Sequence, residues 1–109
     1  MATLSDLTSA DGIDAALALP GLLLLDVYTQ DCVICRRLEP MVAAVAASSG
    51  GAVQARKLDA TRHVEFAAKH AIHGVPTLLL FREGQLIDRR AGFATASALR
   101  EWIAAQARQ

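Results

Sequence analysis

Apolar and polar positions follow two different periods along the chain. Two dense apolar runs, Leu22–Tyr28 and Thr77–Phe81, are too short for ordinary helices and sit next to turn-forming residues. Short runs of this kind are typical of central strands that are buried on both faces of a sheet. Val53–Leu58 alternates loosely, as a strand does. Glu83-Gly84 turns the second run into Leu86–Ala91, which predicts a hairpin.

A helical period begins after Cys32. Apolar residues recur there at steps of three and four, which predicts one long helix with an apolar stripe and with Pro40 inside it. Shorter helices are predicted to begin at Ser9 and at Thr61, both of which can cap a helix through their hydroxyl oxygens. Thr95 or Ser97 is predicted to start the last helix.

The order of these elements predicts an α/β fold. Helices and strands alternate and then end in a hairpin and a helix, with a further short strand expected near Thr3-Leu4. This order implies a central mixed β-sheet of four to five strands flanked by about four helices. A chain of 109 residues with 53% hydrophobic residues is long and apolar enough to form one domain over residues 1–109.

The charge pattern argues against nucleic acid and membrane partners. Lys plus Arg and Asp plus Glu number 11 each, and no basic run is interleaved with aromatic residues. The apolar stretch Ala15–Leu25 follows acidic residues, is interrupted by Pro20-Gly21 and ends at Asp26, so it matches neither a signal-peptide core nor a membrane span. We therefore expect a cytoplasmic protein.

The two cysteines of the chain, Cys32 and Cys35, lie three positions apart where a buried strand leads into a helix. So small a loop gains little stability from a disulfide, which favours a chemical role for the sulfurs. The free N–H groups and the dipole of a helix start stabilise a thiolate, the nucleophilic form of cysteine. We predict that Cys32 is the exposed attacking thiol, and that Cys35, one turn further along, is the buried resolving thiol.

Over nearly its whole length the chain resembles the thioredoxin family. The matching segments are Leu22–Pro40, Lys57-Leu58-Asp59, Gly74-Val75-Pro76-Thr77, Phe81, Gly84 and Gly92. The resemblance implies a thioredoxin fold and dithiol–disulfide exchange with protein disulfide substrates. It implies a thioredoxin reductase or other dithiol donor as the electron source, and a role in electron transport and cell redox homeostasis. We also expect a monomer with no cofactor beyond the redox-active pair itself.

The resemblance also gives roles to residues around the cysteines. It implies a cis Pro76 beside them, with backbone groups left free for an extended substrate peptide. The predicted substrate-binding residues are Val75, Pro76, Thr77, Asp31, Val33, Ile34, His73 and Gly92. His73 precedes Pro76 by three residues, and it is either a rim residue of the site or a solvated loop histidine.

Asp26 and Lys57 match family positions too. Burial in a strand raises the pKa of a carboxyl group, which lets Asp26 accept the Cys35 proton as a general base. Lys57, on a neighbouring strand, would moderate that shift. The alternative is a buried ion pair between these two residues with no catalytic role.

The active-site motif departs from the Trp-Cys-Gly-Pro-Cys of the family. Here Asp31 replaces the Trp, while Val33 and Ile34 replace Gly and Pro. A carboxylate about 7 Å from the Cys32 thiolate opposes it by roughly 1 kcal/mol in a partly solvated site. Asp31 can also cap the helix and compete for its N–H groups. We predict a less acidic Cys32 than in ordinary thioredoxins and a different set of partners.

Two other functions compete with the enzymatic one. The groove can serve as a partner-binding module with vestigial exchange activity, or the CxxC pair can bind a metal or an iron–sulfur cluster. Tetrahedral metal sites need four ligands. The sequence has no second CxxC, and its three histidines (His63, His70 and His73) form no tight pair, so we predict no metal site.

Overall fold

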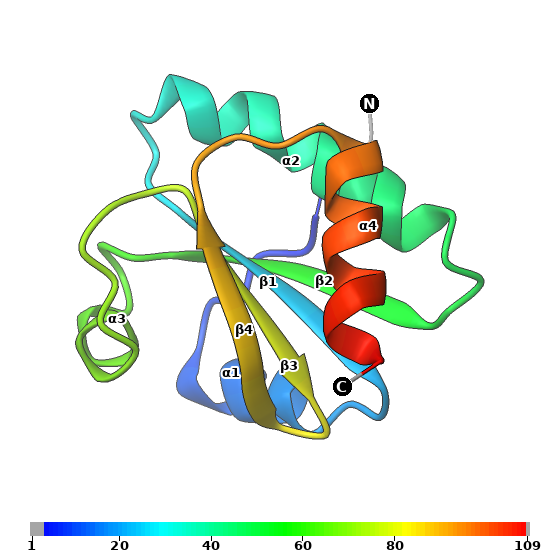
Figure 1. The fold of residues 1–109 in the computed structure, drawn as a ribbon. Coiled ribbons are helices and arrows are strands. Elements are labelled where there is room, and N and C mark those ends of the chain that lie inside the picture. Colours follow the sequence, from blue (N-terminus) through cyan, green and yellow to red (C-terminus); the bar gives the residue numbers. More distant parts are fainter. Residues whose placement is uncertain (1–3, 109) are drawn as a thin grey trace.

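The computed structural model describes residues 4–108, and its elements follow the predicted order (Figure 1). The helices are α1 (Ala10–Leu17), α2 (Val33–Ala47), α3 (Val64–Lys69) and α4 (Ala96–Ala107). The strands are β1 (Leu22–Tyr28), β2 (Val53–Asp59), β3 (Thr77–Arg82) and β4 (Gln85–Ala91). Thr3 of the expected additional strand lies outside the described residues. Within them, a single bridge joins Asp6 to Lys57 of β2.

The sheet has four strands in the order β2-β1-β3-β4. β1 pairs parallel with β2 and antiparallel with β3, and β3 and β4 form the predicted hairpin. The mixed sheet with four helices confirms the predicted fold class. The central position of β1 explains why Asp26 is the one charged residue in its apolar run, because both faces of the strand are covered.

Helices cover both faces of the sheet (Figure 1). Since successive side chains of a strand point to opposite faces, Leu24 joins one core cluster while Leu23 and Leu25 join the other. The first cluster includes Leu38 of α2 and Leu99 of α4. The second includes residues of α1, with Phe66 of α3 packed against it. The two clusters therefore pack against opposite faces of the sheet.

Side-chain hydroxyls cap two helices as predicted. Gly12 N donates to Ser9 Oγ over 2.9 Å, and Ala98 N donates to Thr95 Oγ1 over 3.1 Å. The predicted Thr61 cap is wrong. Both the hydroxyl and the backbone N–H of Thr61 donate to the Asp59 carboxylate, over 2.7 and 2.9 Å, and α3 begins only at Val64. The hydroxyl of Thr61 binds the buried Asp59 carboxylate two residues earlier and does not cap α3.

The pairing of β1 with β3 assembles one functional edge of the sheet. Val27, near the end of β1, is paired with Thr77 at the start of β3. The chain leaves β1 towards Cys32 and enters β3 from Pro76, so the two loops lie at the same edge (Figure 1).

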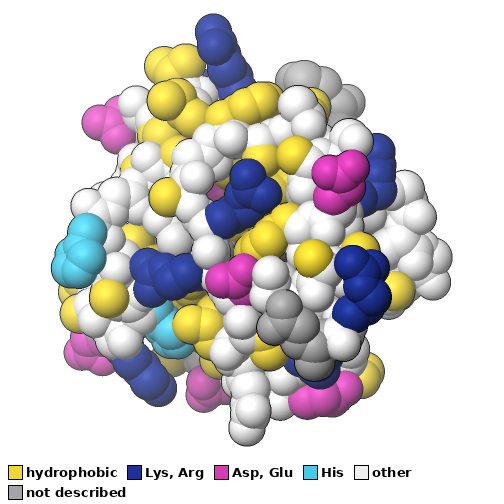
Figure 2. Space-filling model, viewed as in Figure 1, with side chains coloured by type: hydrophobic (Ala, Val, Ile, Leu, Met, Phe, Trp, Pro, Cys, Tyr) yellow, Lys and Arg dark blue, Asp and Glu magenta, His cyan; other side chains and the backbone are white. Residues whose placement is uncertain are grey.

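The surface over these elements carries charges of both signs. Figure 2 shows Lys and Arg side chains interspersed with Asp and Glu on the viewed face, without a large patch of one sign. None of the helices in residues 4–108 has the length and apolar character that a membrane crossing requires.

Candidate active site

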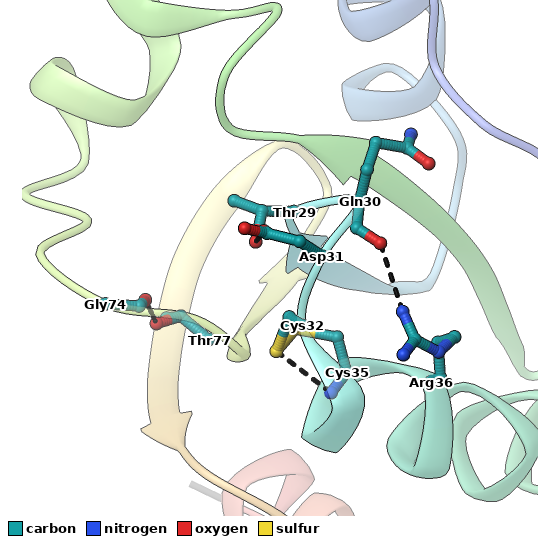
Figure 3. Close-up of a disulfide and its surroundings, with 8 residues drawn as sticks. All are labelled: Thr29, Gln30, Asp31, Cys32, Cys35, Arg36, Gly74 and Thr77. Atoms are coloured by element: carbon teal, nitrogen blue, oxygen red, sulfur yellow. Dashed lines mark hydrogen bonds between the residues drawn. A yellow bond between two sulfur atoms is a disulfide. The ribbon is translucent and has the colours of Figure 1, made fainter.

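Cys32 and Cys35 form a disulfide at the start of α2 (Figure 3). Their Cα atoms lie 5.2 Å apart. Cys35 is 3% exposed, whereas Cys32 is partly exposed at the cap position of the helix. This contrast in exposure matches the predicted division between an accessible sulfur and a buried one.

The helix start donates directly to the accessible sulfur. Cys35 N lies 3.1 Å from Cys32 Sγ and donates a hydrogen bond to it. After reduction the same N–H group and the helix dipole favour a negative charge on Cys32 Sγ. The helix therefore supplies part of the electrostatic stabilisation that a nucleophilic thiolate needs.

Asp31 is exposed and turned towards the preceding residues. Its carboxylate accepts a hydrogen bond from Thr29 Oγ1 over 3.3 Å (Figure 3). Asp31 does not cap α2, because Cys32 occupies the cap position and its own sulfur accepts the helix N–H. Arg36 Nη1 donates to the backbone oxygen of Gln30 over 3.1 Å, which braces the loop before Cys32.

Exposed apolar side chains follow the accessible sulfur at the start of α2. Val33 and Ile34 are 55% and 50% exposed, and apolar side chains gather over the start of α2 at the top of Figure 2. Phe93, which follows β4 and which the sequence did not single out, is 49% exposed. Replacing Gly-Pro with Val-Ile thus gives the rim two large exposed apolar groups.

A groove runs along the loop before β3. The Val75–Pro76 bond is cis, which confirms the expectation from the resemblance. Gly92 N donates to Pro76 O over 3.1 Å, and Thr77 Oγ1 donates to Gly74 O over 2.7 Å. Neither backbone group of Val75 has a hydrogen-bond partner among the described residues.

This groove encloses about 300 Å³ and brings together most of the predicted substrate-binding residues. Its lining consists of Ala71, His73, Gly74, Val75, Pro76, Thr77, Arg89, Ala91 and Gly92. His73 is exposed on the rim. Arg89, which the sequence analysis did not place here, donates to the backbone oxygens of His70 and Ala71 over 2.6 and 3.0 Å.

Asp26 lies buried behind the disulfide. It is 1% exposed, and its Oδ1 atom has no hydrogen-bond partner in the described chain. Burial, with a smaller contribution from the Glu39 carboxylate, raises the pKa of Asp26 from 3.8 to about 7, while Lys57 opposes the rise. A cavity of about 200 Å³ is lined by both Asp26 and Cys35. The buried carboxyl and the buried sulfur therefore line the same cavity.

Lys57 pairs with Glu39, a residue that the sequence analysis missed. Lys57 Nζ lies 3.2 Å from Glu39 Oε1, and its ammonium also lies 5.1 Å from the centre of the Tyr28 ring. The alternative prediction, an ion pair between Asp26 and Lys57, is wrong. Among the described residues the ion pairs are Lys57–Glu39 and Arg62–Asp59. Glu39 follows Cys35 by four residues, and this spacing on one helix face is the signal that could have found it.

A second polar network holds the loop that leads to Cys32. Tyr28 Oη donates to Asp6 Oδ2 over 2.6 Å, and Gln30 Nε2 donates to Asp59 Oδ2 over 3.1 Å.

Two of the histidines make contacts of their own, away from the cysteines. His63 Nε2 lies 2.8 Å from Leu7 O, and His70 Nδ1 lies 3.1 Å from Phe66 O. Within residues 4–108, no group of three or more His, Cys, Asp or Glu side chains could hold a metal ion.

Cys32 and Cys35 form a disulfide, and Cys32 is accessible to the sulfur of a substrate. This arrangement supports the chemistry of a thiol–disulfide oxidoreductase. The thioredoxin family model matches residues 8–105. Over 81 residues the chain is 32% identical to a thioredoxin from Staphylococcus aureus, a match covering 74% of this chain and 78% of that one. The chain belongs to the thioredoxin family and is a dithiol–disulfide oxidoreductase.

Solved structures agree with this assignment. A mutant thioredoxin from Halobacterium salinarum NRC-1 superposes with a TM-score of 0.86 at 25% identity, covering 95% of this chain and 90% of that one. Thioredoxin from Malassezia sympodialis gives a TM-score of 0.82 at 22% identity, covering 97% and 92% of the two chains. The second likeness supports the fold alone.

Proposed function

We propose that this chain reduces protein disulfides through Cys32 and Cys35, as a specialised relative of the general thioredoxins. The contrast between the partly exposed Cys32 and the 3%-exposed Cys35 carries the proposal. The exposed Val33 and Ile34 and the charged Asp31 at the rim support a partner set different from that of a protein with the usual motif.

The first step joins protein and substrate. The Cys32 thiolate attacks one sulfur of the substrate disulfide, so that a bond forms between the two proteins and the substrate disulfide breaks. The other substrate sulfur leaves as a thiolate. The free N–H and C=O groups of Val75 can pair with an extended substrate backbone, and Pro76, Thr77, His73 and Gly92 shape the groove beside it.

The second step releases the substrate. Cys35 gives its proton to the Asp26 carboxylate and attacks Cys32 Sγ, which forms the Cys32–Cys35 disulfide and breaks the mixed disulfide. Two electrons leave with the substrate thiolate. A base works best when its pKa lies near the working pH, and Asp26 has a pKa of about 7. Lys57 tempers the basicity of Asp26.

The oxidised pair must then be reduced for another cycle. A thioredoxin reductase or another dithiol donor would supply two electrons by the same exchange chemistry, with no further cofactor. We propose that the chain acts as a monomer in the cytoplasm, in electron transport and cell redox homeostasis. Its balanced charge and mixed-sign surface give no support for nucleic acid or membranes as partners.

The test is to trap the mixed disulfide. Cys35→Ser leaves Cys32 free to attack but removes the resolving thiol, so we expect a stable covalent complex with a disulfide-containing model protein. Cys32→Ser is the matched control and should form no such complex. The double variant, assayed for partner binding, tests the alternative: undiminished function without either sulfur would contradict the proposal and favour a binding module.

A further inference from the structure

The cavity behind the disulfide brings together three charged side chains from three elements. Asp26 comes from β1, Lys57 from β2 and Glu39 from α2, and Cys35 shares the lining. Asp26 is 1% exposed, while the side chains of Lys57 and Glu39 are 18% and 19% exposed. The ion pair therefore lies nearer to solvent than the lone carboxyl.

Glu39 is held in place by two contacts. Its Oε1 lies 3.2 Å from Lys57 Nζ, and its Oε2 accepts a hydrogen bond from Leu4 N over 2.9 Å. Lys57 is the register partner of Asp26 on the adjacent strand, yet its ammonium is directed to Glu39. Asp26 Oδ1 has no hydrogen-bond partner in the described chain.

We propose that Glu39 is a positioning residue for the proton transfer between Cys35 and Asp26, because its carboxylate holds the Lys57 ammonium at the outer part of the cavity. The inference rests on the proposed function. In the resolving step the Cys35 proton passes to a carboxylate of Asp26. A carboxylate in contact with an ammonium is a weaker base, so the place of Lys57 decides how well Asp26 accepts that proton.

The charged groups around Asp26 agree with this role. Glu39 and Arg36 of α2 and Lys57 of β2 line the cavity, together with Tyr28 of β1 itself. Arg36 is exposed and donates to a backbone oxygen of the loop before Cys32. After burial itself, Glu39 is the largest influence that raises the pKa of Asp26, and Lys57 lowers it. Glu39 thus acts on Asp26 both directly and by holding Lys57.

The titration of Asp26 in Glu39→Gln tests the proposal. The amide keeps the size and an acceptor for Leu4 N but loses the charge. We expect the titration midpoint of Asp26, followed by carboxyl ¹³C chemical shift in the oxidised protein, to fall by about one unit or more. Adding Lys57→Met to this variant should raise the midpoint again. Glu101→Gln, an exposed site on α4, is the matched control and should leave the midpoint unchanged.

A kinetic readout separates positioning from general stability. The rate at which a Cys32–glutathione mixed disulfide resolves should have a pH midpoint that moves with that of Asp26. If Glu39→Gln does not fold, Lys57→Met alone replaces it, with an expected rise of the Asp26 midpoint. An unchanged midpoint in Glu39→Gln, or equal midpoints in the single and double variants, would overturn the inference. Failure of Cys35→Ser to trap a substrate would instead overturn the proposed function.

Discussion

Two buried carboxyl groups on neighbouring strands behave in opposite ways. Asp26 of β1 and Asp59 of β2 are each 1% exposed. The pKa of Asp26 rises to about 7, whereas that of Asp59 falls below its usual value. Burial is the largest single influence on each, and it acts to raise both values.

The number of hydrogen-bond donors explains why the pKa values of the two carboxyl groups move in opposite directions. Asp59 accepts bonds from Thr61 Oγ1, Thr61 N and Gln30 Nε2, over 2.7, 2.9 and 3.1 Å, and Arg62 Nε lies 4.0 Å away. Together these donors outweigh burial and keep Asp59 ionised. The Oδ1 atom of Asp26 has no such donor among the described residues. Asp59 therefore serves as a fixed anchor for the loop before Cys32, and Asp26 as a group that can take up a proton.

The largest expected effect comes from Asp26→Asn, which should stabilise the protein above neutral pH. The pKa of Asp26 is raised from 3.8 to about 7 by folding, so ionisation at high pH costs the native state up to about 4 kcal/mol. The stability of the unaltered protein should fall as the pH rises from about 4 to 7. Denaturant unfolding at pH 8 should show the gain, and the gain should vanish below pH 4. Equal stability of both proteins at pH 8 would contradict this account of Asp26.

Asp59→Asn should have the opposite sign. It removes the charge that strengthens three hydrogen bonds, and hydrogen bonds to charged groups contribute about 1.5–3 kcal/mol. We expect a loss of about 2 kcal/mol at pH 7, measured by the same unfolding experiment. Because the folded pKa is lowered, the contribution of the charge is present above the ordinary pKa of 3.8 and is lost as the pH falls further. A more stable variant at pH 7 would remove the contrast with Asp26.

Asp31 is a third carboxylate, exposed to solvent, and removing its charge should have the smallest effect of the three substitutions. Asp31→Asn removes a charge that opposes the Cys32 thiolate by roughly 1 kcal/mol, so the Cys32 pKa should fall by less than one unit. The pH dependence of thiol alkylation measures this change in the reduced protein. Thr29→Val, which removes the hydroxyl bound to Asp31 while keeping its charge, is the matched control. A Cys32 pKa already below about 6.5 in the unaltered protein would contradict the expected role of Asp31.

The fold was predictable because periodicity and local signals agreed. The dense apolar run of β1 indicated a central strand, and the stripe after Cys32 indicated a helix that buries Leu38 and Val42. The Thr61 cap failed because the sequence cannot show that Asp59 is buried two residues earlier and competes for the hydroxyl. The hydrogen bond to Asp59 outweighed the tendency of Thr61 to cap a helix.

The chemistry of the site was predictable only in part. The spacing of the cysteines and the place of Asp26 in an apolar strand were enough to predict that Cys35 and Asp26 are buried and that Cys32 is accessible. Glu39 was missed because its partner Lys57 is distant in the chain and meets it only when α2 packs on the sheet. Arg89 lines the groove through strand geometry that has no signature in the sequence.

The most direct test of the account is a redox titration of the purified protein. Thiols are alkylated and counted by mass after equilibration in glutathione buffers of graded potential. We expect one two-electron transition between a bonded and a free Cys32–Cys35 pair, with a tenfold change in their ratio for each ~30 mV. A pair that stays free, or stays bonded, across the whole range would contradict it.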